Sequence, residues 1–253
     1  MENIFAKIAE IKSSGQVAAL CIITATSGSA PRKAGAKMIV TAAGVSYGTI
    51  GGGQLERQVT EQALELCRQM QQPVTLHIDL KDDTAMHCGG KVSVYVEPLL
   101  PDERLVIFGA GHVGAALARL ARMLGFAVTL VDNRENLTKP LTNEGFEVIA
   151  EEYIPAAQNL ATNDHSFLVV TTPQHRYDHE VTGILAQKPY RYLGMIGSRR
   201  KVAEAQRYFR EHKILDQQAI DKIDMPIGIP FNAQTPAEIA ISILAKIIDV
   251  RNS

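Results

Sequence analysis

Residues 104–134 read RLVIFGAGHVGAALARLARMLGFAVTLVDNR, and this stretch constrains the fold more than any other part of the chain. The apolar run 105–108 is short and rich in branched side chains, which is typical of a buried parallel strand. A glycine turn follows, then apolar residues at helical spacing, and then a second apolar run, 127–131, that ends in Asp132. The order strand, glycine turn, helix, strand and acid predicts an α/β domain with a doubly wound parallel sheet.

Each residue type in this glycine turn has a physical role in binding a dinucleotide. Gly109 permits the tight turn, Gly111 lets the backbone approach a pyrophosphate, and Gly114 lets the helix lie close to the sheet. His112 lies in the same turn, and Asp132 follows Gly111 by 21 residues, where an acid accepts hydrogen bonds from ribose hydroxyls. The alternative is a doubly wound domain that has kept the turn but binds no nucleotide.

Composition narrows the class of protein. The chain has 253 residues, of which 46% are hydrophobic, so it can form two domains with real cores. Its formal net charge of −1 gives no general attraction to nucleic acid or to a membrane surface, and no apolar run is long enough to span a bilayer. The first ten residues lack the apolar core of a signal peptide.

The cysteines indicate a reducing compartment. There are three, at positions 21, 67 and 88, and no two of them form a CxxC pair. This spacing argues against a disulfide framework and a structural zinc site, and the cytoplasm fits it best. Cys21 and Cys67 fall in apolar patterns and are expected in the core.

A proline-rich stretch, residues 98–103, divides the chain. The residues before it alternate between helical and strand patterns, and the glycine unit lies after it. Prolines and charges between two strands are typical of a domain boundary. We therefore expect a smaller α+β domain at residues 1–100 and the doubly wound domain at 104–253.

Two stretches of the smaller domain could hold an anion. Arg32 and Lys33 lie in a Gly/Ser/Pro loop, residues 26–37, that contains no acid. Gly51, Gly52 and Gly53 precede a helix, where consecutive backbone N–H groups can form an anion-binding nest. A solvated surface turn is the alternative for the cationic loop.

Cys88 differs from the other two cysteines. It lies in the polar loop 81–90, beside His87 and before two glycines. A thiol next to an imidazole can become a thiolate, which binds soft metals or attacks sulfur. The alternative is a loop cysteine without a function.

The second domain contains two further polar loops after predicted strands. His175, Asp178 and His179 follow the strand at 166–172, in a loop expected to face the glycine turn because both follow parallel strands. They could bind a metal, act as acid and base, or cap the next helix, with Asp178 as the capping residue.

The other loop follows the strand at 190–196. Ser198 there has the character of an N-cap, and Arg199 and Arg200 place two cations at the start of the next helix. This arrangement suits a phosphate, although a solvated helix start is the alternative.

Several motifs together resemble the XdhC/CoxI family, and the resemblance covers nearly the whole chain in the right order. The matching stretches are GSAPRKAGAKM (28–38), GTIGGGQLE (48–56), HCGGKVSVYVEPL (87–99), FGAGHVG (108–114), LVDNR (130–134), TTPQHRYDHE (171–180), GMIGSRRK (194–201) and TPAEIAISILAKII (235–248). The resemblance implies a small N-terminal domain joined to a C-terminal Rossmann-like domain, in a homodimer.

The resemblance also implies a function. Members of this family are accessory proteins that bind the molybdopterin-type molybdenum cofactor, promote its sulfuration and help to deliver it to xanthine dehydrogenase and related molybdenum hydroxylases. The expected partners are such a hydroxylase and a sulfur-donating desulfurase, and Cys88 would contact molybdenum or handle sulfur. We do not expect a hydroxylase in this chain itself, because three dispersed cysteines cannot hold iron–sulfur clusters.

Two alternatives remain open from the residues. One is an NAD-dependent oxidoreductase that uses the Gly109 turn and Asp132, with His175 or His179 as general acid or base. The other is a dinucleotide-gated scaffold without chemistry. We expect an accessory protein rather than an enzyme that turns over substrate.

Overall fold

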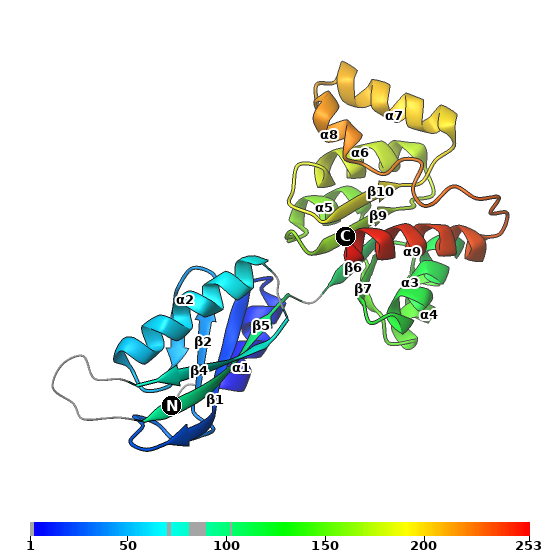
Figure 1. Cartoon of the computed structure of the whole chain (residues 1–253). Coiled ribbons are helices and arrows are strands. Elements are labelled where there is room, and N and C mark those ends of the chain that lie inside the picture. The colour runs from blue at the N-terminus through cyan, green and yellow to red at the C-terminus, as the bar shows by residue number, and fades with distance from the viewer. Residues whose placement is uncertain (1–2, 70–71, 81–89, 102) are drawn as a thin grey trace. The chain divides into compact units, whose positions relative to one another are not determined.

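The computed structural model describes residues 3–69, 72–80, 90–101 and 103–253 (Figure 1). The chain divides into two compact units, residues 1–102 and 103–253, and each unit contains its own sheet. Among the described helices, none is both long and apolar enough to cross a membrane.

The first unit is an antiparallel sheet with one helix on each face (Figure 1). Its elements are α1 (Ile4–Ser13), β1 (Ala18–Ser27), β2 (Lys37–Thr41), β3 (Ser46–Gly48), α2 (Gly53–Gln69), β4 (Val74–Asp79) and β5 (Lys91–Leu99). The strand order is β3-β2-β1-β5-β4. Alternate residues of β1 face opposite sides, so Ala19, Cys21 and Ile23 pack with α2, whereas Ala18 and Leu20 belong to the core beside α1.

Strand β5 extends further than the sequence predicts. Pro98 was expected to begin the linker, but it pairs with Ala19 of β1 inside the strand. On the other side of β5, the pairing with β4 starts only at Val74 and Val96. Beyond Val96 this side of β5 has no neighbouring strand among the described residues, and a missing backbone N–H is tolerated at such an edge.

The second unit has a parallel sheet with helices on both faces (Figure 1). Its elements are β6 (Arg104–Phe108), α3 (His112–Met123), β7 (Ala127–Val131), α4 (Glu135–Asn143), β8 (Glu147–Ile149), α5 (Tyr153–Asn159), β9 (Ser166–Val170), α6 (His175–Leu185), β10 (Tyr192–Met195), α7 (Arg199–Glu211), α8 (Gln217–Asp221) and α9 (Pro236–Asn252). The strand order β10-β9-β6-β7-β8 is doubly wound, as the glycine unit predicts.

The alternation of the buried strands creates two cores. Leu105 and Ile107 face the side covered by α3 and α9, whereas Val106 and Phe108 face the side covered by α5, α6 and α7. Both faces of the sheet are therefore buried, which explains why its strands are continuous apolar runs.

The last helix is apolar around most of its surface, which predicts cover from the other domain or from a second subunit. Instead, α9 packs against α3 within the same unit, and Ile243 and Ile247 are fully buried there. Of its large apolar residues, Ile241 stays half exposed. The sequence Thr235-Pro236-Ala237-Glu238 predicts a capping box, and the helix begins with this capping box in the structure.

Candidate functional site

A cavity of ≈ 420 Å³ opens where the direction of chain winding reverses, between β6 and β9. Three loops line it, residues 111–114, 171–173 and 196–198, together with Asp178, Lys201 and Pro236. These loops follow the carboxyl ends of three parallel strands, where ligands bind in open α/β sheets. The predicted convergence of the glycine turn and the loop after β9 is thus confirmed.

Two glycines of the turn are required by the protein's own packing. Gly109 has a φ of +115°, and a Cβ at this position would overlap the carbonyl oxygen of Thr171. A Cβ at Gly114 would overlap the carbonyl oxygen of Gly109. They therefore bring β6, β9 and α3 close together.

Gly111 is different, because no described part of the protein requires a glycine there. Its φ of −68° is open to any residue, and a Cβ would have no atom within 4 Å. Gly111 nevertheless lines the cavity, so a side chain at this position would project into free space at the site. The position is suited to a ligand that approaches the backbone closely.

The start of α3 supplies hydrogen-bond donors to this cavity. Gly111 is the N-cap and offers no side-chain acceptor, and the first intrahelical bond there runs from Ala115 N to Gly111 O. The N–H groups of His112, Val113 and Gly114 have no intrahelical acceptor because they lie in the first turn. The His112 side chain is exposed at the rim.

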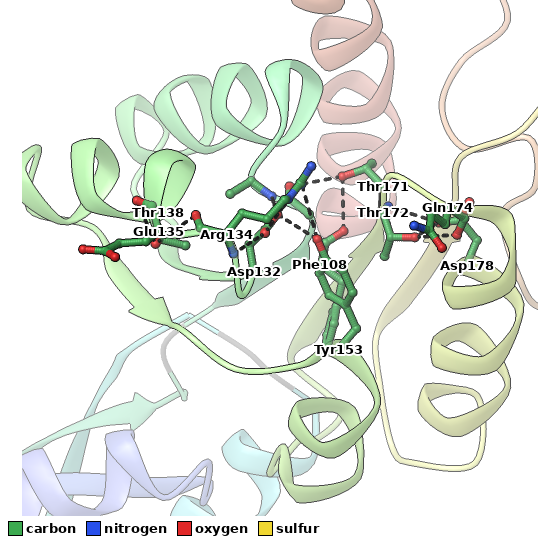
Figure 2. A network of polar contacts seen from close by, with 12 residues as sticks. Phe108, Asp132, Arg134, Glu135, Thr138, Tyr153, Thr171, Thr172, Gln174 and Asp178 are labelled. Carbon is green, nitrogen blue, oxygen red and sulfur yellow. Dashed lines mark hydrogen bonds and ion pairs between the residues drawn. The ribbon is translucent and has the colours of Figure 1, made fainter.

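Asp178 also lines this cavity, and its hydrogen bonds hold the loop after β9 (Figure 2). Its Oδ1 accepts hydrogen bonds from the backbone nitrogen of Thr172 at 3.0 Å and from Thr172 Oγ1 at 2.6 Å. Asp178 is buried and lies in the first turn of α6, whose N-cap is Gln174. Asp178 therefore stabilises the loop after β9 and is not the N-cap of α6.

Of the two histidines of this loop, the structure describes the side chain of His179. His179 packs against the aromatic rings of Tyr208 and Phe209 on α7, at centroid distances of 5.5 and 6.5 Å. His175 is the first residue of α6, and its side chain lies outside the described part. Within the described residues, no three His, Cys, Asp or Glu side chains form a group that could hold a metal ion.

The loop after β10 contributes Ser198, and the helix that follows contributes Lys201, which is not among the predicted site residues. Ser198 is the N-cap of α7, as predicted, and its Oγ accepts from the Lys201 backbone nitrogen at 3.4 Å. Lys201 lines the cavity, whereas Arg200 Nε is paired with Glu204 on the exposed side of α7 at 3.0 Å. Arg199 lines a neighbouring cavity. The helical period places Lys201, and not Arg200, beside the N-cap.

Asp132 is fully buried, and the protein itself supplies its hydrogen-bond donors (Figure 2). Oδ2 accepts from Ala110 N at 2.7 Å, Tyr153 Oη at 2.8 Å and Arg134 Nη2 at 2.6 Å. Oδ1 accepts from the backbone nitrogen and Nε of Arg134 at 3.1 and 2.8 Å. Burial raises the pKa of Asp132, but these hydrogen bonds outweigh burial and lower the pKa overall. The carboxylate therefore connects the glycine turn, the end of β7 and α5 by hydrogen bonds.

In the first unit, the nest at Gly51, Gly52 and Gly53 already holds a carboxylate. Glu56 Oε1 accepts from the backbone nitrogens of Ile50, Gly51 and Gly52 at 3.0, 3.3 and 2.9 Å. Burial raises the pKa of Glu56, but these bonds and one from Thr49 lower it overall. An external anion would have to displace this side chain.

The cationic loop lies beside this nest. A Cβ at Gly51 would lie 2.5 Å from Cγ of Pro31, the residue before Arg32. Arg32 and Lys33 are both exposed. The structure thus brings two of the predicted anion-binding stretches together at one end of the antiparallel sheet.

Of the three cysteines, Cys88 lies outside the described residues. Cys21 and Cys67 are buried in the core between the sheet and α2, as predicted. Burial raises the pKa of the Cys21 thiol to about 12 and also raises the pKa of Cys67. Both are structural.

Curated relatives match most or all of this sequence. The chain is 35% identical over 257 residues to the uncharacterized protein YqeB of Escherichia coli (strain K12), and the match covers 99% of this chain and 47% of that protein. It is 26% identical over 178 residues to a protein of Bacillus subtilis (strain 168) described as a probable subunit of xanthine dehydrogenase, with 70% of this chain and 49% of that protein covered. The chain thus spans about half the length of these relatives.

The fold also occurs in a solved structure. It is the crystal structure of a xanthine dehydrogenase from Bacillus halodurans, with a TM-score of 0.54 and 22% sequence identity, and the match covers 98% of this chain and 95% of that one. Residues 105–247 match the family described as the XdhC Rossmann domain, and residues 11–79 match the XdhC and CoxI family. The first unit and the Rossmann-like second unit together place this chain in the XdhC/CoxI family.

Proposed function

We propose that this protein binds the molybdenum cofactor and takes part in its maturation and insertion into molybdenum hydroxylases of the xanthine dehydrogenase type. The observation that carries this proposal is the free space beside Gly111 in the cavity. No described part of the protein fills this space, and the packing of the protein does not require a glycine there. Family membership supplies the class of ligand. When bound in a hydroxylase, this cofactor supplies the redox chemistry at molybdenum.

The donor set at the cavity fits the phosphate end of such a cofactor. The free N–H groups at the start of α3 and the positive end of its dipole favour an anion. Lys201 adds a positive charge to the lining of the cavity and has no ion-pair partner among the described residues. Backbone donors and one cation suit a phosphate monoester, which accepts several hydrogen bonds.

The partners follow from this role. A carrier of this cofactor would receive sulfur from a desulfurase and would dock with a molybdenum hydroxylase, and we propose that it does so as a homodimer. Cys88 is our candidate for contact with molybdenum or for sulfur handling, and it lies outside the described residues. Arg32 and Lys33, exposed on the first unit, are candidates for further contacts with an anionic ligand.

Asp132 argues against a conventional role for NAD. An acid at this position of a dinucleotide-binding domain accepts from the ribose hydroxyls. Here five hydrogen bonds from protein donors already use the Asp132 carboxylate. A bound ribose would have to break this network, so we favour a phosphate-bearing ligand that does not depend on Asp132.

The test is to purify the protein from cells that make the cofactor and to measure bound pterin and molybdenum by mass spectrometry and absorbance. We expect the wild type to retain both, and Gly111→Ala to lose at least about tenfold in retention with an unchanged melting temperature. Lys201→Ala should lose retention as well. Lys222→Ala is the matched control, because Lys222 is exposed and lines neither this cavity nor the neighbouring one lined by Arg199.

Two results would count against the proposal. One is wild-type protein that contains no pterin and does not bind added molybdopterin at micromolar concentration. The other is saturable NADH binding that competes with pterin retention and is accompanied by steady turnover of a carbonyl or purine substrate, which would favour the oxidoreductase.

A further inference from the structure

A second and larger cavity, of ≈ 570 Å³, adjoins the first in the second unit. The two cavities share Ile196 and Gly197, which follow β10. The walls of the second cavity come from Arg199, from the segment 224–233 and from the first two turns of α9. A ligand with its phosphate at Gly111 can therefore extend past Gly197 into this second cavity.

Asp224 is the acid in the wall of this cavity, and its position is fixed by β10. Its backbone nitrogen donates to Leu193 O at 2.9 Å, and its carbonyl oxygen accepts from Met195 N at 3.0 Å. Its side-chain Oδ2 accepts from Tyr192 Oη at 2.5 Å and from Gly228 N at 2.8 Å. Four hydrogen bonds therefore hold the residue in place.

The second carboxylate oxygen is available to a ligand. In the described part of the chain, Oδ1 of Asp224 accepts no hydrogen bond, although the residue lines the cavity and is only partly exposed. A carboxylate oxygen is an acceptor only, so its complement is a group with N–H donors. Carbon-rich side chains of Ile229 and Phe231, which are 40% and 52% exposed, form another part of the wall. Together they suit a flat, apolar-faced ring with N–H groups at one edge.

We infer that the second cavity binds the heterocycle of the ligand, a fused 2-amino-4-oxopyrimidine ring whose adjacent N–H groups donate to Asp224 Oδ1. This inference rests on the proposed function, in which the phosphate of a pterin cofactor lies at Gly111. The same donor edge occurs in pterins and in guanine, so Asp224 selects the ring class and the rest of the cavity selects between them. Arg199, a planar cation in the same wall, can stack on the ring face.

The experiment uses the full chain and four probes: neopterin monophosphate, guanosine 5′-monophosphate, inosine 5′-monophosphate, which lacks the 2-amino group, and inorganic pyrophosphate, which lacks the ring. Affinities are measured by titration calorimetry for the wild type and for Asp224→Asn. The asparagine oxygen can still accept from Tyr192 and Gly228, but its NH₂ group then faces the N–H edge of the ring. We expect at least a tenfold loss of neopterin monophosphate binding, little change for inorganic pyrophosphate, and weak binding of the inosine nucleotide throughout.

The controls separate this inference from the proposed function. Asp249→Asn makes the same chemical change on the exposed face of α9 and should leave all affinities unchanged. Neopterin monophosphate binding that is insensitive to Asp224→Asn, or no binding of any ring probe by the wild type, overturns the inference. Tight guanosine monophosphate binding that requires Asp224 supports the inference but counts against the molybdenum cofactor as the ligand.

Discussion

Glu56 Oε1 lies 2.9 Å from the backbone nitrogen of Gly52, so the glycine nest of the first unit is filled by a side chain from the helix that the nest precedes. The same oxygen accepts from Ile50, Gly51 and Thr49. A carboxylate at this position satisfies donors that would otherwise require water or an external anion. In this structure, the nest therefore stabilises the connection between β3 and α2.

Glu56→Ala should open this nest. We expect the first unit to lose about 1–3 kcal/mol in free energy of unfolding, because several donors then lose a charged acceptor. Millimolar phosphate or sulfate should restore part of that stability in the variant and not in the wild type. Thermal unfolding with and without the anion measures both effects, with Glu61→Ala, an exposed change on the same helix, as the control. Equal responses of wild type and variant to the anion would contradict this view of the nest.

Asp132→Asn should destabilise the second unit by about 3 kcal/mol at pH 7, since it removes the charge that pairs with Arg134 at a buried position. Urea denaturation at neutral pH measures this difference. Arg134→Lys keeps the charge but loses the bidentate pairing with the carboxylate, so it should destabilise the second unit less than Asp132→Asn does.

The same pair predicts a pH dependence. The hydrogen bonds to Asp132 lower its folded-state pKa below its value in the unfolded chain, which is about 3.9. Its stabilisation is therefore fully present above that pH and is lost as the pH falls through the folded pKa. The difference in stability between the wild type and Asp132→Asn should therefore begin to shrink as the pH falls below about 4. A difference that is constant from about pH 7 to about pH 3 would show that the charge of Asp132 is not the cause.

Replacement by alanine should destabilise the protein at Gly114 but not at Gly111. Gly114→Ala should cost at least about 2 kcal/mol, because the new methyl group overlaps the carbonyl oxygen of Gly109. Gly111→Ala should change stability by no more than about 0.5 kcal/mol, since its φ is ordinary and its surroundings are open. Chemical denaturation of the two variants makes the comparison. Similar losses in both would mean that Gly111 has a structural role.

The two described thiols should not react in the folded protein. In a Cys88→Ser variant, Cys21 and Cys67 should be labelled by a disulfide reagent at pH 8 only after unfolding. With a pKa of about 12 for Cys21, only about one thiol in ten thousand is ionised at that pH, and the core excludes the reagent. Rapid labelling of the folded variant would contradict the burial of these side chains.

The sequence predicts most of the second unit because local patterns and tertiary structure agree there. The glycine unit at 104–134 predicts a strand, a helix and a strand, and these are β6, α3 and β7. The same logic predicts that the loop after β9 lies at the cavity beside Gly111. The N-caps Ser198 and Thr235 follow from residue type and position alone.

Side-chain partners are less predictable, since they come from distant parts of the chain. The position of Asp132 in the motif predicts a ribose-binding acid, yet Tyr153 and Ala110 donate hydrogen bonds to its carboxylate in the folded chain. Lys201 lines the cavity, and Arg200 does not, because of the direction in which α7 leaves its N-cap.

By itself, the sequence determined the order of strands and helices, the doubly wound sheet and the place of the glycine turn, because these depend on apolar periodicity and on backbone freedom at glycine. Only the tertiary structure decided which polar groups remain available to a ligand. Gly111 and Asp224 Oδ1 are open, whereas Asp132 and the Gly51 nest are satisfied internally. The physical reason is that a hydrogen-bonding group has few partners, and folding assigns those partners across the whole chain.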